Sequence, residues 1–162
     1  YGASKAMAEG KIFEENFSAL VIRTSAFFGP WDKYNFVHTV FRSLSRNEQI
    51  FASDDLIISP TYIPHLVSAT LELLFDSESG VWHIANDDEV SWKQFAIKVA
   101  NSAGLNERLI TGIQNSQLHN QALRPKNSVL KSQRGNLMPT LDYAIHRFFD
   151  ECMTLPKAVQ KL

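Results

Sequence analysis

The sequence predicts a mixed α/β fold. Apolar residues switch repeatedly between helical spacing and short extended runs along the chain. The run ALVI at 19–22, which ends at Arg23, is typical of a strand buried on both faces of a parallel sheet. With 162 residues and 44% hydrophobic content, the chain is long enough for one domain with a substantial core.

The first half of the chain predicts two helices separated by extended segments. Alanine, methionine and lysine at 1–11 favour an opening helix, and the strand at 19–23 follows. Gly29 and Pro30 break the chain after this strand. Apolar residues then recur at helical spacing over 36–44, and the stretch 49–63 is extended and interrupted by Pro60.

The second half predicts three helices and one strand. Pro64 suits the first turn of a helix over 64–74, and a short alternating strand follows at 81–85. Ser91 and Gln94 form a capping box before a helix that stops near Gly104. A last amphipathic helix covers 141–149, with Thr140 as its cap, whereas 111–138 is poorly periodic and is expected to be largely loop.

Composition narrows the classes of partner. Sixteen basic and seventeen acidic residues nearly balance, without long runs of one sign, so nucleic acid and membrane surfaces are not expected as main partners. The partner is expected to be small. The single cysteine, Cys152, suits a reducing, cytoplasmic compartment, and the five scattered histidines predict no metal site.

Tyr1 and Lys5 form the first candidate site. Residues four apart in a helix lie on one face, so a phenol and an ammonium here can approach the same bound molecule. A nearby cation favours phenolate, which lets a tyrosine donate and recover a proton near neutral pH. The alternative is a solvated pair without function, which the YxxxK spacing alone does not exclude.

Five segments in order extend this pattern: YGASKAMAEGK, ALVIRTSAFFGP, ISPTYIPHLVSATLELL, GVWHIANDDEVSWKQFA and LRPKNSVL. Together they resemble the C-terminal half of the extended short-chain dehydrogenase/reductase family, most closely the dTDP-4-dehydrorhamnose reductases. The resemblance implies the C-terminal part of a Rossmann-type fold with a substrate-binding lobe. It also implies NADPH or NADH as cofactor and reduction of the 4-keto group of a nucleotide-linked 6-deoxysugar.

The resemblance also implies roles for residues near the cofactor. Tyr1 would protonate the carbonyl oxygen, and Lys5 would bind the nicotinamide ribose. Arg23, Thr24 and Ser25 match the segment that leaves the strand beside the nicotinamide. For these three, a plain strand end is the alternative.

Further residues match the substrate side of the family. Asn35 corresponds to a substrate-side asparagine, although a helix-capping role is equally expected. Arg124 lies where the family closes the pocket over the nucleotide, and its planar guanidinium suits a diphosphate. A surface arginine without a ligand is the alternative.

Ala26 departs from the family pattern, which usually has a bulky aromatic after RTS. The aromatic wall of the sugar pocket would then have to come from neighbours, with Phe28 as a candidate substrate contact beside Phe27 and Trp31. The departure predicts relaxed or shifted sugar specificity.

The expected organisation is an active-site helix and sheet strand over 1–30, followed by a region, 31–162, that is mostly substrate lobe with returning sheet elements. The dinucleotide-binding half is absent from these residues, and the chain opens without an initiator methionine, which favours a piece of a longer protein. Alone it is expected to be inactive and to self-associate, and a homodimer is expected. An epimerase or dehydratase of the same superfamily, or a non-catalytic binding module, remains an alternative.

Overall fold

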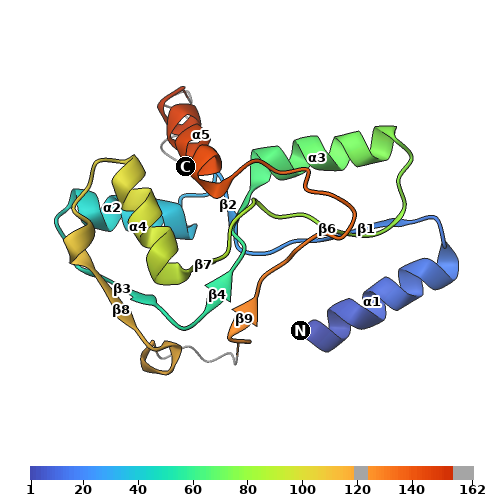
Figure 1. The fold of residues 1–162 in the computed structure, drawn as a ribbon, viewed down its shortest axis with the longest axis horizontal. Helices are drawn as coiled ribbons and strands as arrows, with labels where there is room; N and C mark the ends of the chain where they lie inside the picture. Colours follow the sequence, from blue (N-terminus) through green and yellow to red (C-terminus); the bar gives the residue numbers. More distant parts are fainter. Residues whose placement is uncertain (119–123, 155–162) are drawn as a thin grey trace.

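The computed structural model describes residues 1–118 and 124–154 as alternating helices and short strands (Figure 1). No helix of this part is long and apolar enough to cross a membrane. The elements are α1 (Gly2–Glu15), β1 (Leu20–Arg23), β2 (Phe27–Phe28), α2 (Phe36–Ser45), β3 (Ile50–Ser53), β4 (Ile57–Ile58), β5 (Thr61–Tyr62), α3 (Ile63–Phe75), β6 (Gly80–His83), β7 (Val90–Ser91), α4 (Trp92–Ser102), η1 (Glu107–Leu109), β8 (Ile110–Ile113), η2 (Asn115–Gln117), β9 (Asn127–Ser128) and α5 (Leu141–Thr154).

Strands β1 and β6 pair in parallel, with Leu20 opposite Gly80 and Arg23 opposite His83. Helices α1 and α3 lie on opposite sides of this pair (Figure 1). The predicted parallel strand is confirmed. The prediction that both of its faces are buried is wrong, because Val21 is its one buried residue. The reason is that α1 contributes no buried side chain, and no second strand pairs with β1 among the described residues.

A small core joins α3 to this sheet. Ala69 and Leu73 pack with Trp82, and Pro64 stands in the first turn of the helix, as predicted. The guanidinium of Arg134 lies 4.2 Å from the Trp82 ring centroid and also binds Glu78. The segment around residue 134 is thereby held against the β6 side of the sheet.

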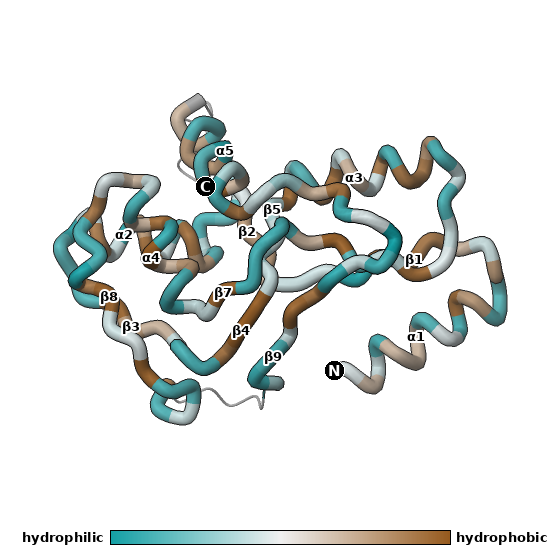
Figure 2. Tube along the Cα trace, viewed as in Figure 1, coloured by the Kyte–Doolittle hydropathy of each residue, from teal (hydrophilic) through white to brown (hydrophobic). Residues whose placement is uncertain are grey.

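The larger core lies in the lobe built from the remaining elements. Strand β4 is central, with β7 antiparallel on one side and β9 parallel on the other, while β3 pairs with β8 and β2 with β5. Figure 2 shows that β4, whose two residues are isoleucines, is hydrophobic. Phe28 is 1% exposed at the centre of an aromatic cluster with Tyr62, Phe95 and Phe148.

Helix α4 begins as the sequence predicts. Ser91 and Gln94 form both bonds of the capping box, and Gly104 follows the helix with a φ of 66°. Lys98 of α4 then bridges two other segments, with its Nζ 3.1 Å from Asp88 and 2.8 Å from Asp142. Helix α4 therefore links the loop before β7 to α5.

The stretch 111–138 is only partly the loop that its weak periodicity predicts. Strand β8 begins at Ile110 and pairs with β3 in parallel, and β9 pairs with β4. Residues 119–123 lie outside the described part. The short strands escape sequence reasoning because four or fewer residues, one of them Gly112, give too brief a pattern.

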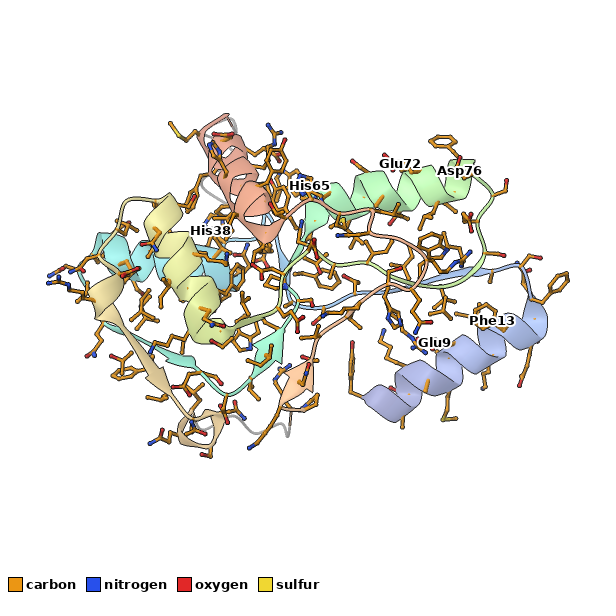
Figure 3. All side chains as sticks on the ribbon, viewed as in Figure 1. Glu9, Phe13, His38, His65, Glu72 and Asp76 are labelled. Atoms are coloured by element: carbon orange, nitrogen blue, oxygen red, sulfur yellow. The ribbon has the colours of Figure 1, made fainter. Side chains whose placement is uncertain are left out.

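Two histidines pack against α5. His38 of α2 meets the Phe148 ring at 5.0 Å, and His65 of α3 stacks on Tyr143 at 5.7 Å (Figure 3). Burial lowers the pKa of both imidazoles. For His38, Arg42 lowers the pKa further, whereas the Pro30 backbone and Asp32 raise it.

We expect Phe28→Ala to destabilise the protein by about 3–5 kcal/mol, because it empties the centre of the aromatic cluster. The neighbouring Phe27 is a matched control, since it is 52% exposed and Phe27→Ala should cost only about 0.5 kcal/mol. Urea unfolding of both variants measures the difference. Equal losses would contradict the assignment of Phe28 to the core.

The two histidines predict loss of stability in acid. Above the ordinary histidine pKa of about 6.5 both rings are neutral in either state, whereas below it the unfolded chain binds protons first. Arg147 also lowers the pKa of His65, which Glu151 opposes. When the pH is lowered from about 7.5 to about 5.5, the urea midpoint of the wild-type protein should fall. It should fall less in a His38→Gln, His65→Gln double variant. An equal fall in the double variant would contradict the role of the two buried imidazoles.

Candidate active site

Tyr1 and Lys5 occupy the first turn of α1. Tyr1 is the N-cap residue, and its carbonyl accepts a hydrogen bond from the Lys5 N–H at 3.0 Å. The Lys5 Nζ lies 5.7 Å from the centroid of the Tyr1 ring. Tyr1 is 96% exposed. The phenol and the ammonium therefore share one helical turn and can both reach a molecule bound beside it.

Helix α1 runs back along β1, so that its N-terminus lies toward the end at which β1 and β6 finish (Figure 1). Ligands of open parallel α/β sheets bind outside the carboxyl ends of the strands. The direction of α1 thus brings the candidate proton donor to the end of the sheet where such ligands bind.

Arg23, the last residue of β1, is joined to α1. Its Nε donates to Glu9 Oε1 at 2.9 Å and its Nη2 to Glu9 Oε2 at 2.6 Å. The Nη1 lies 3.4 Å from His83 Nε2 on β6. The hydrogen bond from Arg23 lowers the pKa of Glu9. The guanidinium is therefore occupied by protein groups, and a cofactor contact by Arg23 stays a prediction that concerns its backbone.

Thr24 and Ser25 continue the chain beyond β1. The Thr24 hydroxyl donates to Thr61 Oγ1 at 3.2 Å, which ties this segment to β5. Both residues are half-buried, and Ala26 follows with a φ of 48°, in the left-handed region that residues other than glycine rarely adopt. The segment turns sharply here, and the N–H of Thr61 donates to the Ala26 carbonyl at 3.1 Å.

Two of the predicted substrate residues lie inside the lobe. Asn35 caps α2 by accepting from the His38 N–H at 3.0 Å, and its amide donates to the carbonyls of Gly29 and Asp32. The capping alternative is thus confirmed. Phe28 belongs to the larger core. Substrate contact by either side chain stays a prediction that this burial does not favour.

Arg124 lies on the surface three residues before β9, and the described residues offer it no hydrogen bond or ion pair. Its guanidinium is accessible for an anion. No group of three or more histidines, cysteines and acidic residues in the described ranges could hold a metal ion.

A cavity of about 330 Å³ opens beside the carboxyl end of β6. Asn86 fixes one wall by accepting from the Tyr62 N–H at 2.8 Å and donating to the Pro139 carbonyl at 2.9 Å. An ion pair between Lys131 and Glu89 joins the two segments that enclose it. The lining residues are His83, Ala85, Asn86, Asp87, Asp88, Glu89, Val129, Leu130, Lys131, Ser132 and Asn136.

Sequence reasoning missed Glu9 and His83. Glu9 lies four residues after Lys5 and so continues the line that begins at Tyr1. The four-residue spacing was the signal in the sequence that could have pointed to Glu9. Its partner on β1, Arg23, could not be predicted, because the sequence does not show that α1 runs back along this strand.

Comparison with known proteins identifies the family. The model of the RmlD substrate binding domain matches residues 1–151. The spore coat polysaccharide biosynthesis protein SpsK of Bacillus subtilis is 32% identical over 130 residues, which are 80% of this chain and 45% of that protein. A dTDP-4-dehydrorhamnose reductase of Aggregatibacter actinomycetemcomitans is 29% identical over 141 residues, which are 80% of this chain and 48% of that protein. The chain thus spans about half the length of the curated relatives it matches.

Solved structures agree with this assignment. The crystal structure of dTDP-4-dehydrorhamnose reductase from Bacillus anthracis in complex with NADP has a TM-score of 0.84 and 32% identity, covering 93% of this chain and 55% of that one. A UDP-glucose 4-epimerase of Thermus thermophilus has a TM-score of 0.73 at 16% identity, which shows the fold alone. The predicted Rossmann-type α/β fold is confirmed. The chain belongs to the RmlD substrate binding domain family, among the extended short-chain dehydrogenases/reductases that its motifs predict.

Proposed function

We propose that the protein containing this chain reduces the 4-keto group of a nucleotide-linked 6-deoxysugar with NADPH or NADH. The observation that carries this proposal is the exposed Tyr1 phenol with the Lys5 ammonium 5.7 Å from its ring centroid, at the carboxyl-end side of a parallel strand pair. Relatives named dTDP-4-dehydrorhamnose reductases, one of them crystallised with NADP, support it.

The residues present fit the nicotinamide end of such a cofactor. A nicotinamide, when bound, supplies the hydride that adds to the carbonyl carbon. The Tyr1 hydroxyl donates its proton to the carbonyl oxygen, so that the C=O group becomes an alcohol. The Lys5 ammonium stabilises the negative charge left on the phenolate oxygen. Tyr1 then regains its proton from water.

The lobe that follows β1 is the proposed binding part for the nucleotide sugar. Arg124 would hold the diphosphate through its two parallel N–H donors. Ala26 would leave the sugar pocket wider than an aromatic residue does, which favours relaxed specificity. We place the reaction in the cytoplasm, in keeping with the lone Cys152, and we include a homodimer in the proposal.

Consumption of the cofactor tests the proposal against its alternatives. The complete gene product that contains this chain should oxidise one NADPH for each 4-keto sugar nucleotide reduced. An epimerase or dehydratase regenerates its cofactor and would show no net consumption. A non-catalytic module would consume neither NADPH nor the sugar nucleotide. Either of these two results would overturn the proposed reductase function.

In the complete gene product, we expect Tyr1→Phe to lower turnover on the order of a hundredfold or more with cofactor affinity nearly intact, because only the proton donor is lost. Lys5→Met should lower both the turnover and the affinity for the cofactor. Tyr143→Phe, which removes a hydroxyl from the exposed side of α5, is the control for tyrosine loss. Steady-state kinetics and NADPH titration measure the two quantities, and normal turnover by Tyr1→Phe would reject the assignment.

For Arg124, we expect Arg124→Ala to raise the KM for the nucleotide sugar about tenfold or more with little change in kcat, because binding in the ground state and in the transition state is lost together. Arg124→Lys should recover only part, since an ammonium lacks the planar fork. Arg108→Ala, another exposed arginine, is the control. An unchanged KM in Arg124→Ala would exclude the diphosphate contact.

A further inference from the structure

Helix α1 carries the candidate proton donor, and its contacts with the other described residues are few. None of its side chains is buried, and several apolar ones, including Met7 and Ile12, are exposed. Its half-buried residues are Glu9 and Phe13, and Figure 3 shows both on the side that faces β1. On the face toward β1, the described residues give α1 two half-buried side chains, and of these Glu9 is the one that can make a directional contact.

The Glu9–Arg23 pair is such a contact. Its hydrogen bonds of 2.9 and 2.6 Å are bidentate, which constrains both the distance and the plane in which the groups meet. The Glu9 side chain is 21% exposed. Surface ion pairs add little to stability, so the main effect of this one is on geometry.

The guanidinium is held from its other side as well. His83 Nδ1 lies 3.1 Å from the Lys131 carbonyl, which can only accept, so this nitrogen carries the proton. His83 Nε2 is then the acceptor that faces Arg23 Nη1 at 3.4 Å in the neutral ring. A continuous line of polar contacts thus runs from α1 across β1 and β6 to the segment at residue 131.

Tyr1, Lys5 and Glu9 follow one another at four-residue intervals, each about 40° further around the helix. Glu9 lies about 12 Å from Tyr1 along the axis, so a small rotation of the helix at Glu9 moves the phenol relative to the end of β1. Misplacement of a reacting group by about 1 Å can cost about a hundredfold in rate.

We propose that Glu9, acting through Arg23, is a positioning residue that sets the rotation and height of α1 and so aims Tyr1 and Lys5. The effect on catalysis rests on the proposed reductase function. The effect on α1 itself does not, and it can be measured separately.

The kinetic test uses the complete gene product. Glu9→Gln should lower kcat on the order of tenfold or more with the KM for NADPH and the melting temperature little changed, because the ligand contacts and the core are untouched. Glu9→Asp, which keeps a carboxylate, should recover part of the rate. Glu14→Gln changes an exposed acid on the same helix and is the control. A wild-type kcat in Glu9→Gln, or a loss matched by a fall in melting temperature without recovery in Glu9→Asp, would overturn the proposal.

A double-mutant cycle separates this role from direct ligand contact. If Glu9 acts through Arg23, the Glu9→Gln, Arg23→Gln double variant should be no slower than Arg23→Gln alone. Fully additive losses would show that the two residues act independently and would overturn the proposal.

Hydrogen exchange gives a readout that does not need activity. Amides of α1 should exchange faster in Glu9→Gln, whereas those of α4 should be unchanged. If α1 exchanges at the wild-type rate, the positioning role fails even in an active reductase. If α1 loosens but the wild-type protein consumes no NADPH, the proposed function fails and the anchoring of α1 stands.

Discussion

The parallel pairing of β1 with β6 is the constraint on which the rest of the arrangement depends. Its register sets Arg23 opposite His83, so the last residues of both strands meet at one end of the sheet. That meeting gives Glu9 a partner and thereby gives α1 its place on one side, while α3 packs on the other. The chain leaves β1 through Ala26 into the lobe at the same end. The pairing of β1 with β6 therefore brings the candidate proton donor, the ends of both strands and the start of the lobe to one end of the sheet.

The lobe and the active-site helix are held by different physical means. In the lobe, aromatic rings around Phe28 are removed from water, and burial of this kind is the main source of folding free energy. Among the described residues, helix α1 is instead joined to the sheet by an oriented ion pair and by a half-buried Phe13. Burial contributes stability without much direction, whereas charged hydrogen bonds contribute direction with little stability. The division suits a scaffold that must hold one reactive group at a set angle.

Local signals were readable in the sequence, and contacts between distant segments were not. The capping box of Ser91 and Gln94 and the cap by Asn35 depend on neighbours three residues away, so pattern alone located both helix starts. The resemblance of five sequence segments to known reductases predicted the family. The exposure of β1, the burial of Phe28 and the Glu9–Arg23 pair depend on which elements pack together, and fourteen residues separate the two members of that pair. Strand β8 was missed because its pairing with β3 spans sixty residues.

Lys98 is one cation between two carboxylates that belong to different segments. Partial burial acts to lower the pKa of Lys98, but its hydrogen bonds to both carboxylates outweigh this and raise the pKa, so the ammonium keeps its charge. Replacing Lys98 by a neutral residue would leave Asp88 and Asp142 facing each other without a counter-ion, so attraction among three segments would turn into repulsion between two. The loop before β7 borders the cavity at the end of β6. A single substitution on α4 would thereby reach the shape of that cavity without touching a residue of the active-site helix.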